Sequence, residues 1–268
     1  MKLRSIQSRD NPHYKQLRQW ASSAQARRKS GMTVLDGVHL CQAWLQRFGA
    51  PAHCVVAESA LMHPEVAAIV AQCEAGTTEC VLLPDALCTQ LEQVEAGIGL
   101  LFVVPIPTAG VDQLALSRLD RSTLLLDTVQ DPGNLGTILR TAAAAGIQYI
   151  FCSPGTAAVW APKVLRAGMG AHFVLQIAED VDLAQLIRQA AVPVYATQPN
   201  AAKSIYDADL RAPAAWLFGH EGQGISEQLL KLASEHLTIP QSPQVESLNV
   251  AASVAVCLFE QRRQQSGF

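Results

Sequence analysis

Six short apolar runs lie between residues 123 and 240, and they constrain the fold more than any other feature of the 268-residue chain. The runs are TLLLDTV (123–129), YIFCS (149–153), HFVLQI (172–177), VPVYAT (192–197), AAWLFG (214–219) and HLTIP (236–240). Helical patterns separate most of them, over 134–146, 162–168, 182–190 and 226–233, and a last helix is predicted over 247–263. Continuous apolar strands that alternate with helices are typical of a parallel sheet buried on both faces. We therefore predict an α/β fold whose mostly parallel sheet is flanked by helices.

A smaller α/β unit is expected in the first half of the chain. Strands are predicted over 32–37, 52–59, 79–84 and 99–105, and helices over 38–49, 63–76 and 87–97. The segment that follows, from Pro105 to Ser122, has two prolines, a glycine and a polar end, which is typical of a linker. The predicted organisation is a basic helical arm (1–31), a small α/β substrate-binding domain (32–105), a linker (106–122) and a larger domain (123–268).

The arm is the most basic part of the sequence. Its first 31 residues carry eight basic side chains and one acidic side chain, a net charge of +7, whereas the remainder of the chain has −10. One helix is predicted, with Asn11 as its N-cap and Gly31 at its end. This asymmetry indicates a segment that binds a polyanion, and the alternative is an ordinary solvated basic helix. The candidate contact residues are Lys15, Arg18, Arg27, Arg28 and Lys29.

Several classes of protein are disfavoured by what the sequence lacks. There is no apolar run of 18 residues and no secretory signal at the polar N-terminus, so we expect no membrane span and no export. Seven cysteines without a CxxC pair indicate reduced, mostly buried thiols in a cytoplasmic protein. Seven scattered histidines form neither an HExxH motif nor a Cys/His cluster, so no metal site is expected.

Three loops that follow predicted strands carry unusual polar residues. Ligands of open parallel sheets bind at the carboxyl ends of the strands, where such loops lie. The first loop, DPGNLGTILR (131–140), places Asn134 at a helix start and Arg140 one to two turns later. Asn134 can be explained as a helix cap. Arg140 opposes the helix dipole, and this position favours an arginine that faces an anion or a carboxylate.

The other two loops are LFGHEGQGIS (217–226) and IPQSPQVESLNV (239–250). The glycines of the former have the spacing G-x-x-G-x-G, which is neither the dinucleotide fingerprint nor a phosphate-binding P-loop. They indicate either a close approach of the backbone to a ligand or a plain glycine-rich turn. In the latter, Ser247 can be the N-cap of the last helix, whereas Asn249 is unexpected inside a first turn.

Taken in order, these segments resemble the three motifs of the SpoU (TrmH-type) RNA ribose methyltransferases of the SPOUT superfamily. The matching residues are NLGTILR (134–140), LFGHEGQG (217–224) and IP followed by SLNV (239–250). The resemblance implies a deep trefoil knot in the larger domain, S-adenosylmethionine as cofactor, a homodimer, and methyl transfer to a ribose 2′-hydroxyl of rRNA or tRNA. It also implies that Gly219, Ile239 and Leu248 contact the cofactor.

The catalytic set implied by the motifs is Arg140, Asn134, Glu221, Ser247 and Asn249. The arginine of the family has been proposed as a general base. Because a guanidinium resists deprotonation, we favour an electrostatic role in which Arg140 holds a phosphate and the developing 2′-oxyanion. Two alternatives stay open: an RNA-binding protein with the knotted fold but no turnover, and a nicotinamide-dependent enzyme, against which the glycine spacing argues.

Overall fold

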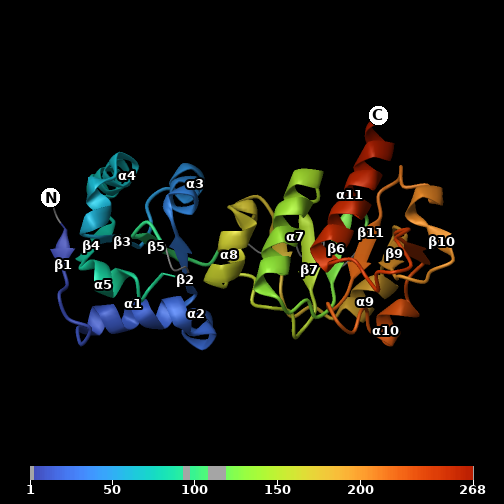
Figure 1. The fold of residues 1–268 in the computed structure, drawn as a ribbon, viewed down its shortest axis with the longest axis horizontal. Coiled ribbons are helices and arrows are strands. Elements are labelled where there is room, and N and C mark those ends of the chain that lie inside the picture. The colour runs from blue at the N-terminus through green and yellow to red at the C-terminus, as the bar shows by residue number, and fades with distance from the viewer. Residues whose placement is uncertain (1–2, 93–96, 108–118, 268) are drawn as a thin grey trace. The chain divides into compact units, whose positions relative to one another are not determined.

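The computed structural model describes residues 3–92, 97–107 and 119–267 (Figure 1). They form two compact units, Met1–Thr108 with Trp160–Phe173 and Ala109–Val159 with Val174–Phe268. Most of the predicted linker lies outside the described residues, which resume at Leu119. Each unit has its own sheet and its own core.

The described part of the first unit contains a mixed sheet in the order β1-β4-β3-β5-β2. Its strands are β1 (Arg4–Ser5), β2 (Met32–Asp36), β3 (His53–Ala57), β4 (Glu79–Leu83) and β5 (Leu100–Pro105). β1, β3 and β4 run parallel, whereas β5 is antiparallel to β2 and β3. The four longer strands lie where the apolar runs predicted them, and the short edge strand β1 was not predicted.

Helices cover both faces of this sheet (Figure 1). They are α1 (Pro12–Ser22), α2 (Ala24–Ser30), α3 (Val38–Phe48), α4 (Pro64–Glu74), α5 (Asp85–Cys88) and the 3-10 turn Ser59–Met62. Helix α8 (Pro162–Gly168) and the 3-10 turn Ala171–Phe173 also pack here, with Leu165 and Phe173 in the core. Sequence patterning had grouped this segment with the second unit, because a short helix between two strands does not reveal which core it joins.

The single helix predicted for the basic arm is wrong, since two helices meet at Ser23. Ser23 has extended backbone angles, and its hydroxyl caps α2 by accepting a hydrogen bond from the N–H of Ala26. Asn11 caps α1 as predicted, through the N–H of His13, and Gly31 ends α2 with a φ of +65°. A serine can serve as a helix residue or as a cap, and this ambiguity hid the break.

The second unit contains a sheet of seven described strands that all run parallel, in the order β10-β12-β9-β11-β6-β7-β8. The strands are β6 (Thr123–Leu126), β7 (Tyr149–Cys152), β8 (Gln176–Ala178), β9 (Val194–Thr197), β10 (Lys203–Ser204), β11 (Ala215–Phe218) and β12 (Glu235–Thr238). The predicted α/β class with a parallel sheet is thereby confirmed. The strand expected from 172 begins only at Gln176, because His172 and Phe173 form a 3-10 turn.

Alternating side chains of this sheet face two layers of helices. Leu125, Phe151 and Leu217 share a core with helices α9 (Leu183–Arg188) and α10 (Glu227–Leu230). Residues one position along the strands point to the other face. On that face Trp216 donates a hydrogen bond to Gln261 of α11 (Val250–Ser266), and α11 packs against α7 (Pro132–Ala145).

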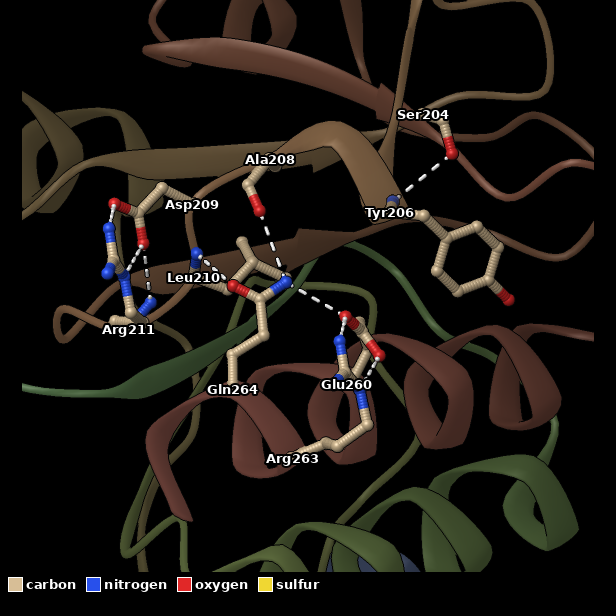
Figure 2. A network of polar contacts seen from close by, with 9 residues as sticks. All are labelled: Ser204, Tyr206, Ala208, Asp209, Leu210, Arg211, Glu260, Arg263 and Gln264. Carbon is tan, nitrogen blue, oxygen red and sulfur yellow. Dashed lines mark hydrogen bonds and ion pairs between the residues drawn. The ribbon is translucent and has the colours of Figure 1, made fainter. Parts of the chain in front are cut away.

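The C-terminal half of α11 is fastened to the chain that leads into β11 (Figure 2). The side-chain oxygen of Gln264 accepts a hydrogen bond of 2.9 Å from the N–H of Leu210, and its amide donates to the carbonyl of Ala208 at 3.2 Å. The same amide donates to Glu260, which also pairs with Arg263 at 2.8 Å. These contacts fix the position of α11 along the sheet and therefore the position of its N-terminus.

All seven cysteines are free and buried. None of the helices in the described ranges combines the length and the apolar character that crossing a bilayer requires.

Candidate active site

The carboxylate of Glu221 lies at the centre of a cluster formed by two of the three unusual loops. Its Oε1 accepts hydrogen bonds of 3.1 Å from the N–H of Asp131 and from Nδ2 of Asn134, and its Oε2 accepts one of 3.2 Å from the N–H of Gln130. Burial raises the pKa of Glu221, but the hydrogen bonds from Asn134 and from the backbone outweigh burial and leave the pKa below its ordinary value. Glu221 is therefore held as an anion.

Asn134 connects this cluster to the third loop. Its Oδ1 accepts a hydrogen bond of 2.9 Å from Nδ2 of Asn249, so the side chains of Glu221, Asn134 and Asn249 form one continuous chain. The structure thus joins three of the five predicted catalytic residues directly.

The helix caps at this site differ from those predicted. Asp131, not Asn134, is the N-cap of α7, since its carboxylate accepts from the N–H of Asn134 at 2.7 Å. Asn249, not Ser247, is the N-cap of α11, accepting from the N–H groups of Ala251 and Ala252. Because Asp131 takes the capping role, the amide of Asn134 is released for contacts between loops.

The glycine loop is a tight turn closed on itself. His220 and Gly224 exchange two backbone hydrogen bonds of 2.9 and 2.8 Å. A Cβ at Gly219 would overlap the backbone of Gly224 and Ile225, so this position requires glycine. Nδ1 of His220 also accepts hydrogen bonds from the N–H groups of Gly222 and Gln223. The contacts of His220 therefore organise the loop, a role that the glycine spacing did not reveal.

Asp127 helps to hold the glycine loop in place, although the sequence had not marked it as a functional residue. It is buried at the end of β6, and its carboxylate accepts hydrogen bonds from the hydroxyl of Ser153 at 3.1 Å and from the N–H of Ser226 at 2.9 Å. It therefore ties the end of the glycine loop to two neighbouring strands. The sequence feature that could have identified Asp127 is its position as an acidic residue inside the apolar run TLLLDTV, because a buried carboxylate needs hydrogen-bond partners.

A cavity of about 500 Å³ opens beside this cluster. Its wall includes the three residues predicted to contact a cofactor, Gly219, Ile239 and Leu248, together with Glu221 and Ser247. A volume of this size is within the range of small-molecule sites. The wall offers backbone groups of the glycine loop, apolar surface from Ile239 and Leu248, and carboxylates including Glu246, a set that suits a nucleoside carrying positive charge.

Arg140 belongs neither to the chain Glu221–Asn134–Asn249 nor to the cavity wall. It is exposed on α7. Within the described ranges its side chain makes no hydrogen bond and no ion pair, so its guanidinium is available to a ligand.

Four of the five basic residues predicted to bind substrate are exposed, namely Lys15, Arg18, Arg28 and Lys29. Arg27 departs from that expectation because its side chain is buried, with 7% exposed. Its guanidinium donates to the carbonyls of Trp20 and Ala21, at the end of α1. Arg27 therefore holds α2 against α1, and charge counting could not separate it from its neighbours.

Comparisons with known proteins identify the family. The profile of the SpoU rRNA Methylase family matches residues 121–259, half of the chain. The chain belongs to the SpoU family. An uncharacterized tRNA/rRNA methyltransferase of Synechocystis sp. is 35% identical over 98% of this chain and 95% of its own length. The 23S rRNA (guanosine(2553)-2′-O)-methyltransferase RlmP of Bacillus subtilis is 28% identical over 97% and 100%.

Solved structures of SpoU proteins share the fold over both units. An RNA 2′-O ribose methyltransferase has a TM-score of 0.83 and 28% identity, covering 98% of this chain and 100% of its own. The AdoMet-bound rRNA methyltransferase of Sinorhizobium meliloti has a TM-score of 0.83 and 25% identity, covering 98% of both chains. The predicted SpoU membership and the fold class of the SPOUT superfamily, whose members carry the knot, are thereby confirmed.

Proposed function

We propose that this protein transfers the methyl group of S-adenosylmethionine to a ribose 2′-hydroxyl of a structured RNA, either rRNA or tRNA. The observation that carries the proposal is the hydrogen-bonded chain Glu221–Asn134–Asn249 beside a cavity lined by Gly219, Ile239 and Leu248. These are the motif residues of a SpoU protein, gathered from three loops onto one edge of the sheet.

The cavity suits S-adenosylmethionine, which supplies an electrophilic methyl group on a sulfonium when bound. The residues that would hold it are Gly219 with its closed loop, whose backbone can be approached closely, and the apolar side chains of Ile239 and Leu248. Carboxylates on the wall, including Glu246, favour a cationic ligand. Ser247 stands on the same wall and can orient a polar group of cofactor or ribose.

The roles of the chain's polar residues follow from their contacts. Glu221 and Asn249 fix the amide of Asn134 from both ends, and this arrangement keeps the start of α7 in register with the cavity. Arg140, which is exposed and unpaired in the described structure, would bind the RNA phosphate and stabilise the 2′-oxygen as its proton leaves. Positioning and charge stabilisation, rather than proton abstraction by arginine, then carry the chemistry.

The proposal includes a homodimer that completes the site. Arg140 is exposed on α7 and is not part of the cavity wall, and α11, which packs on α7, exposes the large apolar side chain of Phe259. An exposed aromatic residue on one of two packed helices and an unpaired arginine on the other fit a surface that a second copy of the chain covers.

The arm is proposed to bind RNA phosphates through Lys15, Arg18, Arg28 and Lys29, which are all exposed. We also propose a cytoplasmic site of action, which seven free, buried thiols support.

The test is methyl transfer from labelled S-adenosylmethionine to RNA from cells that lack the protein, followed by mapping of the ribose methylation. Incorporation into a ribose 2′-oxygen of rRNA or tRNA is expected, together with thermal stabilisation by S-adenosylmethionine but not by NAD. RNA binding without methyl incorporation would instead support the binding protein without turnover. Stabilisation by NAD alone would overturn the cofactor assignment.

A further inference from the structure

Two histidines and a glutamate meet at the edge of the first unit's sheet, far from the methyl-transfer motifs in sequence. His53 and Glu79 are the first residues of β3 and β4, and they are paired neighbours across these two strands. His13 lies in the first turn of α1. The strand pairing fixes two of the three side chains, and the packing of α1 brings the third.

The separations among these side chains match those of metal ligands. Nδ1 of His13 lies 3.4 Å from Oε1 of Glu79, and Nδ1 of His53 lies 3.2 Å from Oε2. One ligand atom from each of the three residues lies within 4.8 Å of the others. Ligands bound tetrahedrally to zinc at about 2.0–2.1 Å are separated by roughly 3.3 Å. Only small side-chain movements would bring the three donors to such distances.

The two histidines are mostly buried and incompletely hydrogen-bonded. The side chains of His13 and His53 are 11% and 18% exposed, against 42% for Glu79. Nε2 of His13 is buried without a hydrogen bond, and Nδ1 of His53 approaches Oε2 of Glu79 at 3.2 Å without the alignment of a hydrogen bond. A buried imidazole nitrogen that lacks a well-aligned partner is costly, and a metal ion between Nδ1 of His53 and the carboxylate would satisfy that nitrogen.

We propose that His13, His53 and Glu79 bind a divalent transition-metal ion of the zinc type, with solvent at the remaining position. Two imidazoles and a carboxylate are a donor set that zinc uses. The ion would join the first helix of the basic arm to the strands β3 and β4, because each of these elements supplies one ligand. No local sequence motif reveals this site, since its three residues are separated by 40 and 26 positions.

The positively charged Arg4 lies beside the proposed site and would repel a bound cation. Its guanidinium lies 3.1 Å from Oε1 of Glu79, and its side chain is more than half exposed on β1. Oε2, which faces His53, is not in contact with Arg4 in the described structure and is the carboxylate oxygen best placed to ligate. Arg4 can then stay on Oε1 as a hydrogen-bonding partner of the ligating carboxylate.

The test is isothermal titration of Zn²⁺ into the full-length protein after dialysis against a chelator. One equivalent is expected to bind to the parent protein and to raise its unfolding temperature. His53→Ala and Glu79→Gln are each expected to weaken binding by about tenfold or more. The matched control is His39→Ala, which removes an exposed histidine of the same unit and should leave binding unchanged.

Co²⁺ provides a second readout that distinguishes these ligands from the buried thiols. The parent protein should show the visible absorption of four-coordinate Co²⁺ without a thiolate-to-metal band, and Glu79→Gln, which preserves side-chain size, should lose that absorption. Circular dichroism establishes that each variant is folded. Absence of stoichiometric binding, or binding that survives in both His53→Ala and Glu79→Gln, would overturn the proposal.

Discussion

Asn134 and Asn249 are 115 residues apart in sequence, yet Nδ2 of Asn249 donates a hydrogen bond of 2.9 Å to Oδ1 of Asn134. Asn249 uses its other side-chain atom, Oδ1, to cap α11, and Asn134 uses its own Nδ2 to reach Glu221. Every polar atom of both amides is thereby engaged, and their orientations are fixed. The start of α7 and the start of α11 are consequently placed together by side chains rather than by backbone pairing.

Replacing Asn249 separates its capping role from its contact with Asn134. Asn249→Ala should cost about 0.5–2 kcal/mol of stability because the cap is removed. Asn249→Ser should retain the cap and most of the stability, because serine is also a good N-cap. Both should lower methyl transfer, since neither can donate to Asn134 as the longer amide does. Thermal unfolding measures the loss of the cap, and turnover measures the loss of the contact with Asn134. If Asn249→Ser turned over as fast as the parent protein, the amide contact would be dispensable.

Glu221→Gln should reduce stability in a manner that depends on pH. The pKa of Glu221 lies below its ordinary value of 4.5 in the folded protein. Its contribution is therefore fully present above that value and is lost as the pH falls through the folded-state pKa. The backbone N–H groups of Gln130 and Asp131 now donate to the carboxylate of Glu221. The side-chain amide of a glutamine would point its own N–H donor at one of these groups, and that hydrogen bond would be lost. The unfolding temperatures of the two proteins should differ at pH 7 and converge as the pH falls through the folded-state pKa of Glu221. A difference independent of pH would contradict a charged role.

Arg140→Lys should lower kcat by about 100-fold, because lysine retains charge but cannot donate two parallel hydrogen bonds. The unfolding temperature should stay unchanged, since Arg140 is exposed and has no protein partner among the described residues. Arg188→Lys, at an exposed position on α9, is the matched control. Steady-state kinetics provide the measurement, and near-normal turnover of Arg140→Lys would exclude bidentate recognition.

Two glycines of the same loop should respond differently to substitution by alanine. Gly219→Ala places a methyl group on the backbone of Gly224 and Ile225, so it should deform the cavity wall and weaken S-adenosylmethionine binding. Gly222→Ala meets only the His220 ring, at an ordinary distance of 3.7 Å, and should be tolerated. Titration calorimetry with the cofactor compares the two. If both variants bound S-adenosylmethionine with equal affinity, the glycine loop would be able to accommodate the added methyl group at position 219.

The arm predicts a steep dependence of RNA affinity on salt. Changing Lys15, Arg18, Arg28 or Lys29 to glutamine removes one positive charge from the RNA phosphates, and each change should reduce the slope of log K against log salt by about 0.7–0.9. Arg27→Gln should instead lower the unfolding temperature, because the carbonyls of Trp20 and Ala21 would be left without their buried donor. Binding assays between low and high salt distinguish these effects. An affinity independent of salt would remove the arm from the RNA interface.

The two sheets were predictable because continuous apolar runs indicate buried strands directly, as in β6 and β11. The residues of the Glu221 cluster were predictable only through their motifs, since no local pattern reveals that Asn134 and Asn249 meet. Cap assignments at Asp131 and Asn249 were missed because asparagine, aspartate and serine cap helices almost equally well. Burial of Arg27 and the clustering of His13 with His53 depend on helix packing, which sequence spacing does not encode.

The fastening of α11 has a consequence for when the protein becomes active. Val250 and Ser253 of this helix form part of the cavity wall, Asn249 holds Asn134, and Gln264 secures the far end of the helix. A nascent chain whose last helix is still inside the ribosomal exit tunnel has neither that wall nor the bond to Asn134. We therefore expect the chain to bind the methyl donor only after this helix has left the tunnel and packed against α7.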